Sequence, residues 1–201
     1  MSAQTPEKNN QALEAGDSQV VEALGERTIV LVGLMGAGKT TVGRRLAARL
    51  QLPFVDADAE IERAAGKSIP EIFEDHGEEA FRDGEKRVIA RILEKGPQVL
   101  ATGGGAYMDE DTRTAIATHG ISLWLKANTA LLLKRVSRRG GRPLLKQGNP
   151  KKILNDLVEK RYPVYGHADI TVESKDVPHQ QFVQLIVEAL SEHLETDGSS
   201  S

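Results

Sequence analysis

The sequence contains no cysteine, and only 4% of its 201 residues are aromatic. The lack of cysteine excludes a disulfide framework, a thiolate metal site and thiol catalysis, and it fits a reducing compartment. No apolar run approaches the roughly 20 residues that a membrane-spanning helix needs. We therefore expect a cytoplasmic protein that does not bind membranes.

The chain also lacks a large excess of charge of either sign. It contains 26 Lys and Arg against 29 Asp and Glu, which gives a formal net charge of −3. Proteins that bind nucleic acids typically carry basic runs or aromatic ladders, and this sequence has neither. We expect no nucleic-acid partner, and we expect a monomer.

The length fits one domain and is too short for two ordinary ones. Residues 1–26 are polar, contain several acidic side chains and lack the apolar core of a signal peptide. We expect a flexible extension at 1–26, a single domain at 27–194 and a flexible tail at 195–201.

The most informative stretch is Gly33 to Thr40, which matches the pattern G-x-x-x-x-G-K-[ST] between an apolar run and an amphipathic run. Glycines let consecutive backbone N–H groups turn toward a phosphate, the lysine reaches the outer phosphates, and the hydroxyl binds Mg²⁺. The helix that follows adds N–H groups and the positive end of its dipole. The stretch predicts a site for a nucleoside triphosphate with Mg²⁺.

Short apolar segments alternate with helical segments along the rest of the chain. We expect strands at 28–32, 53–58, 98–102, 121–126 and 170–173. We expect helices at 41–50 and 59–65, a helix capped by Ser68, and further helices at 78–95, 109–118, 128–136 and from 178 onward. This α/β alternation predicts a five-stranded parallel sheet flanked by helices. Gly84 lies inside one expected helix and predicts a local bend there.

Two acidic residues, Asp56 and Asp58, close the second expected strand. No acidic residue follows the strand at 98–102, so the carboxylate that holds the metal must come from elsewhere. Side chains two positions apart on an extended segment point to the same side of it. The carboxyl ends of strands are also where α/β sheets bind ligands. We expect one carboxylate to hold metal-bound water and the other to accept a hydrogen bond from the attacking hydroxyl.

Two glycine-rich segments suggest further contacts with ligands. Gly103, Gly104 and Gly105 follow a strand directly, which favours close approach of a ligand to the backbone, with a plain tight turn as the alternative. Residues 138–150 are rich in glycine and basic residues, which is typical of a mobile lid that closes over phosphates. A solvated basic loop is the alternative for that segment.

Six pieces of sequence together resemble the shikimate kinase family. They are the Gly33 to Thr40 motif, Asp56-x-Asp58, the Gly77 to Glu85 segment, Gly103-Gly104-Gly105, Arg142-Pro143-Leu144-Leu145, and Arg161 followed by Tyr165. The resemblance implies a P-loop fold like that of nucleoside-monophosphate kinases. It also implies ATP-dependent phosphorylation of the 3-hydroxyl of shikimate, in the pathway to chorismate and the aromatic amino acids.

The resemblance also implies the roles of the substrate-binding residues. Arg82 and Arg161 clamp the shikimate carboxylate, Asp58 binds ring hydroxyls and serves as a base, and the backbone of Gly103 to Gly105 contacts the substrate. An arginine fork suits a carboxylate better than the point charge of lysine. Glu85 either orients Arg82 or touches a hydroxyl, and a surface ion pair is its alternative.

On the nucleotide side, the resemblance assigns catalytic roles to Lys39 and Arg142, which stabilise charge on the transferred phosphoryl group. The expected phosphate contacts are Gly36, Ala37, Gly38, Lys39, Thr40 and Thr41. Thr40 and Asp56 are expected to hold Mg²⁺. Arg138 is expected near the adenine, with Arg135 and Arg139 as alternatives.

Two other functions are alternatives to a shikimate kinase. One is a gluconate kinase of the same fold, against which the triple glycine and the Gly77 to Glu85 segment argue. The other is a regulatory module that binds nucleotide without phosphorylating a substrate. The intact set of Lys39, Thr40, Asp58, Arg82 and Arg161 argues against that module.

Overall fold

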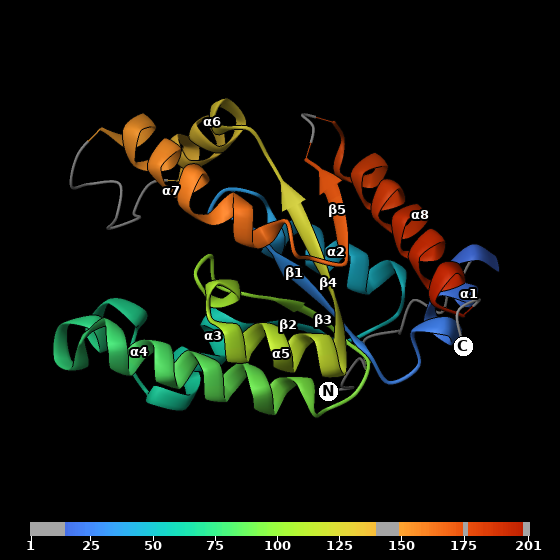
Figure 1. Ribbon diagram of the computed structural model, residues 1–201, viewed down its shortest axis with the longest axis horizontal. Coiled ribbons are helices and arrows are strands. Elements are labelled where there is room, and N and C mark those ends of the chain that lie inside the picture. The colour runs from blue at the N-terminus through green and yellow to red at the C-terminus, as the bar shows by residue number, and fades with distance from the viewer. Residues whose placement is uncertain (1–14, 140–148, 175–176, 199–201) are drawn as a thin grey trace, which may run out of the picture.

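The fold is known from a computed structural model that describes residues 15–139, 149–174 and 177–198. Within these ranges five parallel strands form one sheet in the order β2-β3-β1-β4-β5 (Figure 1). The strands are β1 (Thr28–Val32), β2 (Phe54–Asp56), β3 (Val99–Ala101), β4 (Gly120–Lys126) and β5 (Ile170–Glu173). The predicted five-stranded parallel sheet is confirmed.

Helices cover both faces of this sheet. They are α1 (Ala15–Leu24), α2 (Lys39–Arg49), α3 (Ala57–Ala65), α4 (Ile69–Leu93), the 3₁₀ helix η1 (Ala106–Met108), α5 (Glu110–His119), α6 (Thr129–Arg139), α7 (Pro150–Tyr165) and α8 (His179–Gly198). On one side α8 packs against α1 and α2, and on the other α4 packs against α5 (Figure 1). None of the helices described is both long and apolar enough to cross a membrane.

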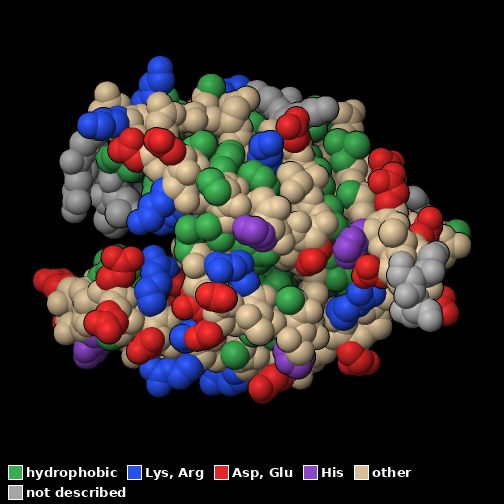
Figure 2. Space-filling view, in the orientation of Figure 1, with side chains coloured by type: hydrophobic (Ala, Val, Ile, Leu, Met, Phe, Trp, Pro, Cys, Tyr) green, Lys and Arg blue, Asp and Glu red, His purple; other side chains and the backbone are tan. Residues whose placement is uncertain are grey.

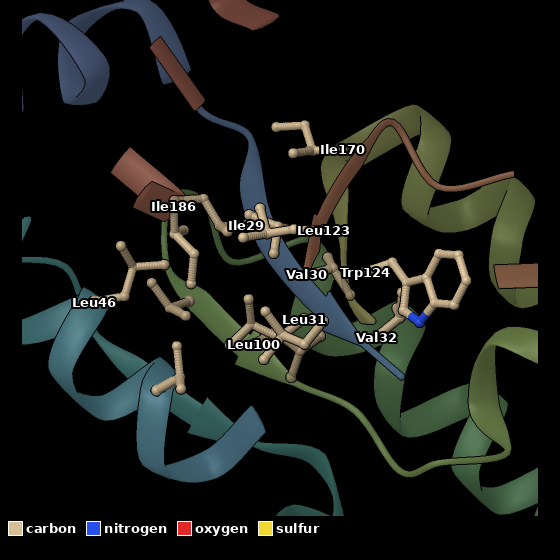
Figure 3. Close-up of a cluster of buried hydrophobic side chains, with 14 of the residues drawn as sticks. Ile29, Val30, Leu31, Val32, Leu46, Leu100, Leu123, Trp124, Ile170 and Ile186 are labelled. Carbon is tan, nitrogen blue, oxygen red and sulfur yellow. The ribbon is translucent and has the colours of Figure 1, made fainter. Parts of the chain in front are cut away.

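The central strand β1 forms the middle of the core. Ile29, Val30 and Leu31 are fully buried, and side chains from both neighbouring strands and from α2 and α8 surround them (Figure 3). In the register of the sheet, Leu31 faces Ala101 of β3 and Leu123 of β4. The carboxyl ends of β1 and β3 therefore lie side by side, and the two glycine-rich turns follow from them.

The expected flexible extension is wrong for residues 15–24, which form α1. Val20 and Leu24 on this helix are each 1% exposed, and the buried carboxylate of Asp17 accepts hydrogen bonds from Arg49 Nε at 2.9 and 3.0 Å. Apolar side chains and a paired carboxylate thus fix the helix to the domain, where sequence composition alone indicated a polar extension. Residues 1–14 lie outside the described ranges.

The expected flexible tail is wrong for residues 195–198, because α8 continues to Gly198. Leu194 is 5% exposed, so the last turns of α8 still pack against the core. Residues 199–201 lie outside the described part of the chain.

The second strand is shorter than predicted, and this changes the position of Asp58. Helix α3 begins at Ala57 because Asp56 caps it: Asp56 Oδ1 accepts a hydrogen bond from the Asp58 N–H at 3.2 Å. Asp58 therefore lies in the first turn of a helix, and the expectation that both acids share one side of an extended segment is wrong.

The bend expected at Gly84 is also misplaced. Helix α4 starts eight residues earlier than Gly77, at a Ser68 capping box, and its one non-helical residue is Gly77, with φ 79° and ψ 176°. Gly84 keeps the helical conformation. No helix was predicted at η1 or α7. Helix α7 begins where the Asn149 side chain accepts hydrogen bonds from two backbone N–H groups.

The segment 138–150, predicted as a lid, falls mostly outside the described ranges. Arg138 and Arg139 form the end of α6, and Asn149 and Pro150 form the start of α7. Arg142 lies between them, outside the residues that the structure describes.

Candidate active site

The Gly33 to Thr40 loop joins the end of β1 to the start of α2. Gly33, Gly36 and Gly38 have φ values of 135°, 84° and 100°, which residues with side chains rarely adopt. The Lys39 ammonium group donates hydrogen bonds to the backbone oxygens of Gly33 at 2.6 Å and Leu34 at 3.2 Å. The loop thus forms the turn and helix start that a phosphate group requires.

Thr40 and Asp56, which the sequence predicts as metal ligands, lie within hydrogen-bond distance of each other. Thr40 Oγ1 donates a hydrogen bond to Asp56 Oδ2 at 2.9 Å, across from α2 to β2. Mg²⁺ prefers oxygen ligands, several of which are usually water molecules. The hydroxyl and carboxylate oxygens of this pair are donors of the kind that fits Mg²⁺. Among the described residues, no group of three or more His, Cys, Asp or Glu side chains is arranged to hold a metal ion.

The triple-glycine turn brings the substrate-side carboxylates and an arginine together. A Cβ atom at Gly103 would lie 2.6 Å from Glu85 Oε1 and 2.9 Å from Asp58 Oδ1. A Cβ atom at Gly105 would lie 2.6 Å from Arg82 Nη1. These separations are shorter than van der Waals contact, so the side chains occupy the space that glycine leaves. This close approach explains the first and third glycines.

Arg82 and Glu85 extend from α4 toward this turn as an ion pair. Arg82 Nη1 donates to Glu85 Oε2 at 2.6 Å, and Arg82 Nη2 donates to the exposed Glu78 carboxylate at 3.3 Å. The Glu85 side chain is 3% exposed, so the predicted alternative of a surface ion pair does not hold. The pairing leaves Arg82 one-third exposed, with its guanidinium group beside the backbone of Gly105.

Glu85 has an unusual electrostatic environment. Burial raises the pKa of its carboxyl group, the hydrogen bond from Arg82 lowers it, and the negative charge of Asp58 raises it further. Its second oxygen, Oε1, is buried and receives no hydrogen bond from any residue that the structure describes. A buried carboxylate oxygen without a donor beside the triple-glycine turn is suited to accept a hydrogen bond from a ligand hydroxyl group.

Arg161 and Tyr165 reach the same turn from α7. Arg161 Nη1 and the Tyr165 hydroxyl group each donate a hydrogen bond of 2.5 Å to the backbone oxygen of Gly104. Tyr165 is fully buried, and burial raises the pKa of its phenol to about 12. The sequence motif contained Tyr165 without assigning it a role.

Arg135 lies against the Gly33 to Thr40 loop, called the phosphate-binding loop from here on. Its Nη1 donates to the backbone oxygen of Ala37 at 3.1 Å and to Ser174 Oγ, just after β5, at 2.8 Å. Arg135 was only an alternative to Arg138 in the sequence analysis. The side chains of Arg138 and Arg139 lie outside what the structure describes, so the prediction for Arg138 stays a prediction.

The structure thus brings most of the predicted site residues to one edge of the sheet. Charged side chains border a hollow between α4 and the α6 and α7 pair (Figure 2). The phosphate-binding loop and Asp56 lie on one part of this edge, and Asp58, Arg82, Glu85 and Arg161 surround the triple glycine on the other. One predicted residue, Arg142, lies outside the described ranges.

Comparisons with known proteins and solved structures point to one family. The family model described as shikimate kinase matches residues 35–191. The shikimate kinase of Bradyrhizobium diazoefficiens is 58% identical over 178 residues, which cover 89% of this chain and 86% of that protein. A solved structure of shikimate kinase from Acinetobacter baumannii in complex with shikimate has 40% identity and a TM-score of 0.79, and the match covers 84% of this chain and 95% of that one.

A gluconokinase from Sinorhizobium meliloti shares the fold only, with a TM-score of 0.60 and 18% identity over 88% of this chain and 98% of that one. The fold is therefore common to kinases with different acceptors, whereas the high identities are to shikimate kinases. The fold is the P-loop fold of nucleoside-monophosphate kinases, as predicted. From its site geometry and these matches together, the chain belongs to the shikimate kinase family.

Proposed function

We propose that this chain, like the family to which it belongs, phosphorylates shikimate with ATP, and that the acceptor is the 3-hydroxyl group. The observation that carries the proposal is the triple-glycine turn, where Asp58, Arg82, Glu85 and Arg161 converge beside a phosphate-binding loop. Shikimate has one carboxylate and three ring hydroxyls, so its site needs fixed cations and directed acceptors. The converging side chains supply two of each.

Arg82 and Arg161 bind the carboxylate in this proposal. Each charge-assisted hydrogen bond contributes about 1.5 to 3 kcal/mol, and two planar forks fix the orientation of the ring. The Glu85 partner of Arg82 holds its guanidinium group in place at 2.6 Å. Arg161 donates to Gly104, so its guanidinium group already lies at the turn that borders the substrate.

Asp58 receives a hydrogen bond from the 3-hydroxyl group and directs that oxygen toward the γ-phosphoryl group. Phosphoryl transfer has a loose, in-line transition state, so positioning and charge stabilisation dominate over proton abstraction. Asp58 takes the proton as the new bond to phosphorus forms. Oε1 of Glu85, buried beside the same glycine, accepts a hydrogen bond from a neighbouring ring hydroxyl.

The nucleotide binds along residues 36–41, whose backbone N–H groups surround its phosphates. Lys39 and Arg142 stabilise the charge that develops on the transferred group, and Arg135 or Arg138 contacts the nucleoside part. Thr40 and Asp56 would hold Mg²⁺, which would neutralise negative charge on the phosphates when bound. The juxtaposition of a hydroxyl and a carboxylate oxygen beside the Gly33 to Thr40 loop supports this assignment.

We also propose that the protein is a monomer in the cytoplasm and that residues 138–150 close as a lid over the phosphates. A closed lid excludes water and so limits wasteful hydrolysis of ATP. Light scattering on the purified chain measures the oligomeric state directly, and a mass of about 22 kDa is expected from the 21.8 kDa chain.

The test is a coupled assay for ADP with purified protein, Mg²⁺ and ATP. We expect ADP release on addition of shikimate and none above background on addition of gluconate. ADP release with gluconate alone would favour the gluconate kinase alternative. ATP binding without ADP release for either acceptor would favour a non-catalytic nucleotide-binding module.

A further inference from the structure

The Gly104 carbonyl group is held by two different kinds of donor. Arg161 and Tyr165 both donate to its oxygen at 2.5 Å, and both extend from the last turns of α7. Arg161 is partly exposed at the site, whereas Tyr165 is fully buried. Only one of the two donors is therefore able to turn toward a ligand.

Tyr165 is fixed by a cluster of aromatic rings. Its ring centroid lies 5.8 Å from Trp124, 6.2 Å from Tyr162 and 6.3 Å from Tyr107. These are contact distances for tilted aromatic pairs, which stabilise one ring orientation. Because burial raises its pKa to about 12, the phenol keeps its proton, and with it the ability to donate, at all neutral pH values.

The orientation of the Gly104 oxygen also sets the direction of a potential donor to the substrate. In a trans peptide group the carbonyl oxygen and the following N–H point in opposite directions, so fixing the Gly104 oxygen aims the Gly105 N–H away from α7. Three consecutive glycines have wide conformational freedom of their own. Backbone N–H groups of Ala106 and Met108 hold the oxygens of Gly103 and Gly105, whereas Arg161 and Tyr165 hold the oxygen of Gly104.

We propose that Tyr165 is a positioning residue, which holds the Gly104 carbonyl group while Arg161 turns from that oxygen to the substrate carboxylate. The proposal rests on the role of Arg161 proposed above. Without the Tyr165 hydroxyl group, Arg161 is the sole side-chain donor to the half-buried Gly104 oxygen among the described residues, and binding of the substrate removes that donor. The cost of that unsatisfied oxygen then appears in substrate binding.

The test compares Tyr165→Phe with Tyr162→Phe in steady-state kinetics. Tyr162 is a matched control because its hydroxyl group also donates to a backbone oxygen, that of Ala127, which is not part of the triple-glycine turn. For Tyr165→Phe we expect the KM for shikimate to rise about tenfold or more, with the KM for ATP within about twofold of wild type. Tyr162→Phe is expected to leave both constants within about twofold.

A second substrate separates this role from a merely structural one. With shikimate methyl ester, which lacks the carboxylate charge, Arg161 is not drawn from Gly104, so the effect of Tyr165→Phe on KM is expected to fall to about twofold or less. An equal rise in KM for acid and ester, or a lower kcat with unchanged KM, would overturn the proposal. A wild-type enzyme without shikimate-dependent ADP release would instead contradict the proposed function.

The wild-type protein allows a test that does not depend on how the variant folds. The chain has three tyrosines, so labelling their Cζ atoms with ¹³C gives three NMR signals, assigned with Tyr107→Phe and Tyr162→Phe. We expect shikimate to shift the Tyr165 signal, because the Gly104 oxygen that accepts from Tyr165 loses its other donor, Arg161. The signals of the other two tyrosines are expected to stay in place. No shift of the Tyr165 signal at saturating shikimate would overturn the proposal.

Discussion

At the scale of single residues, the proposed function assigns Arg82 to the substrate carboxylate. Its guanidinium group is held by Glu85 at 2.6 Å and lies against Gly105. Arg82→Lys keeps the positive charge and removes the planar fork, so the KM for shikimate is expected to rise about tenfold or more with little change in the KM for ATP. Steady-state kinetics measure both constants.

Arg87→Lys is the matched control for this substitution. Arg87 lies on the same helix, is exposed, and donates only to the backbone oxygen of Asp83 among the described contacts. Its replacement is expected to leave both constants unchanged. If Arg82→Lys weakened ATP binding in place of shikimate binding, the assignment of Arg82 to the substrate side would be wrong.

Glu85 gives a pH dependence whose sign follows from its environment. Burial raises the pKa of the Glu85 carboxyl group in the folded state. A carboxyl group with a raised pKa stabilises the fold at low pH, and this stabilisation is lost as the pH rises through the pKa of the folded state. Glu85→Gln keeps the shape and cannot ionise. The melting temperature of Glu85→Gln relative to wild type is therefore expected to rise from pH 4 to pH 7, as wild-type Glu85 ionises.

Thermal unfolding monitored by circular dichroism at a series of pH values measures this difference. The same variant is expected to bind shikimate more weakly, since Arg82 loses its charged partner. A melting-temperature difference that falls as the pH rises would show that the ionised form of Glu85 is the stable one, contrary to this account.

The sequence predicted these residues better than it predicted their geometry. Arg82, Asp58 and Arg161 were identified from motifs, and the structure brings them to one turn. The sequence did not show that Asp58 lies on a helix, because the capping of α3 by Asp56 depends on where the strand ends. It also gave no role to Tyr165, because the acceptor of its hydroxyl group lies 61 residues away along the chain.

At the scale of secondary structure, two glycines of α4 are expected to behave oppositely. Gly84 is helical, and a Cβ atom there would meet nothing within 4 Å, so Gly84→Ala is expected to stabilise the fold by about 0.5 to 1 kcal/mol. Gly77 has φ 79° and ψ 176°, a conformation that is essentially restricted to glycine. Gly77→Ala is expected to destabilise the fold by about 1 to 3 kcal/mol.

Chemical denaturation of both variants and wild type measures these free energies of unfolding. A Cβ atom at Gly77 also has open space around it, so any loss there comes from the backbone conformation alone. If the two alanine variants changed stability equally, the kink would not lie at Gly77.

Element boundaries were predicted well where local signals are strong and poorly where packing decides. The strand β1 matched its prediction, because a fully apolar run precedes the phosphate-binding loop. The helix α1 was not predicted, because the polar composition of the segment did not indicate that Val20 and Leu24 are buried or that Asp17 pairs with Arg49. Tertiary contacts with α8, and the ion pair of Asp17 with Arg49 of α2, make that segment part of the domain.

At the scale of the whole molecule, the sheet order places two half-sites next to each other. β1 lies between β3 and β4 in the sheet, so the phosphate-binding loop that follows β1 and the triple glycine that follows β3 meet at one edge (Figure 1). The two turns are close enough that a Cβ atom at Gly104 would lie 3.6 Å from the Gly33 oxygen. This adjacency allows the γ-phosphoryl group and an acceptor hydroxyl group to approach each other.

The most direct test of this account is identification of the reaction product by ³¹P and ¹H NMR after incubation with ATP, Mg²⁺ and shikimate. We predict one phosphate ester at the 3-hydroxyl group for each ADP formed. An ester at another ring hydroxyl, or ADP formed without any ester, would contradict the proposed placement of the substrate between Asp58 and the phosphate-binding loop.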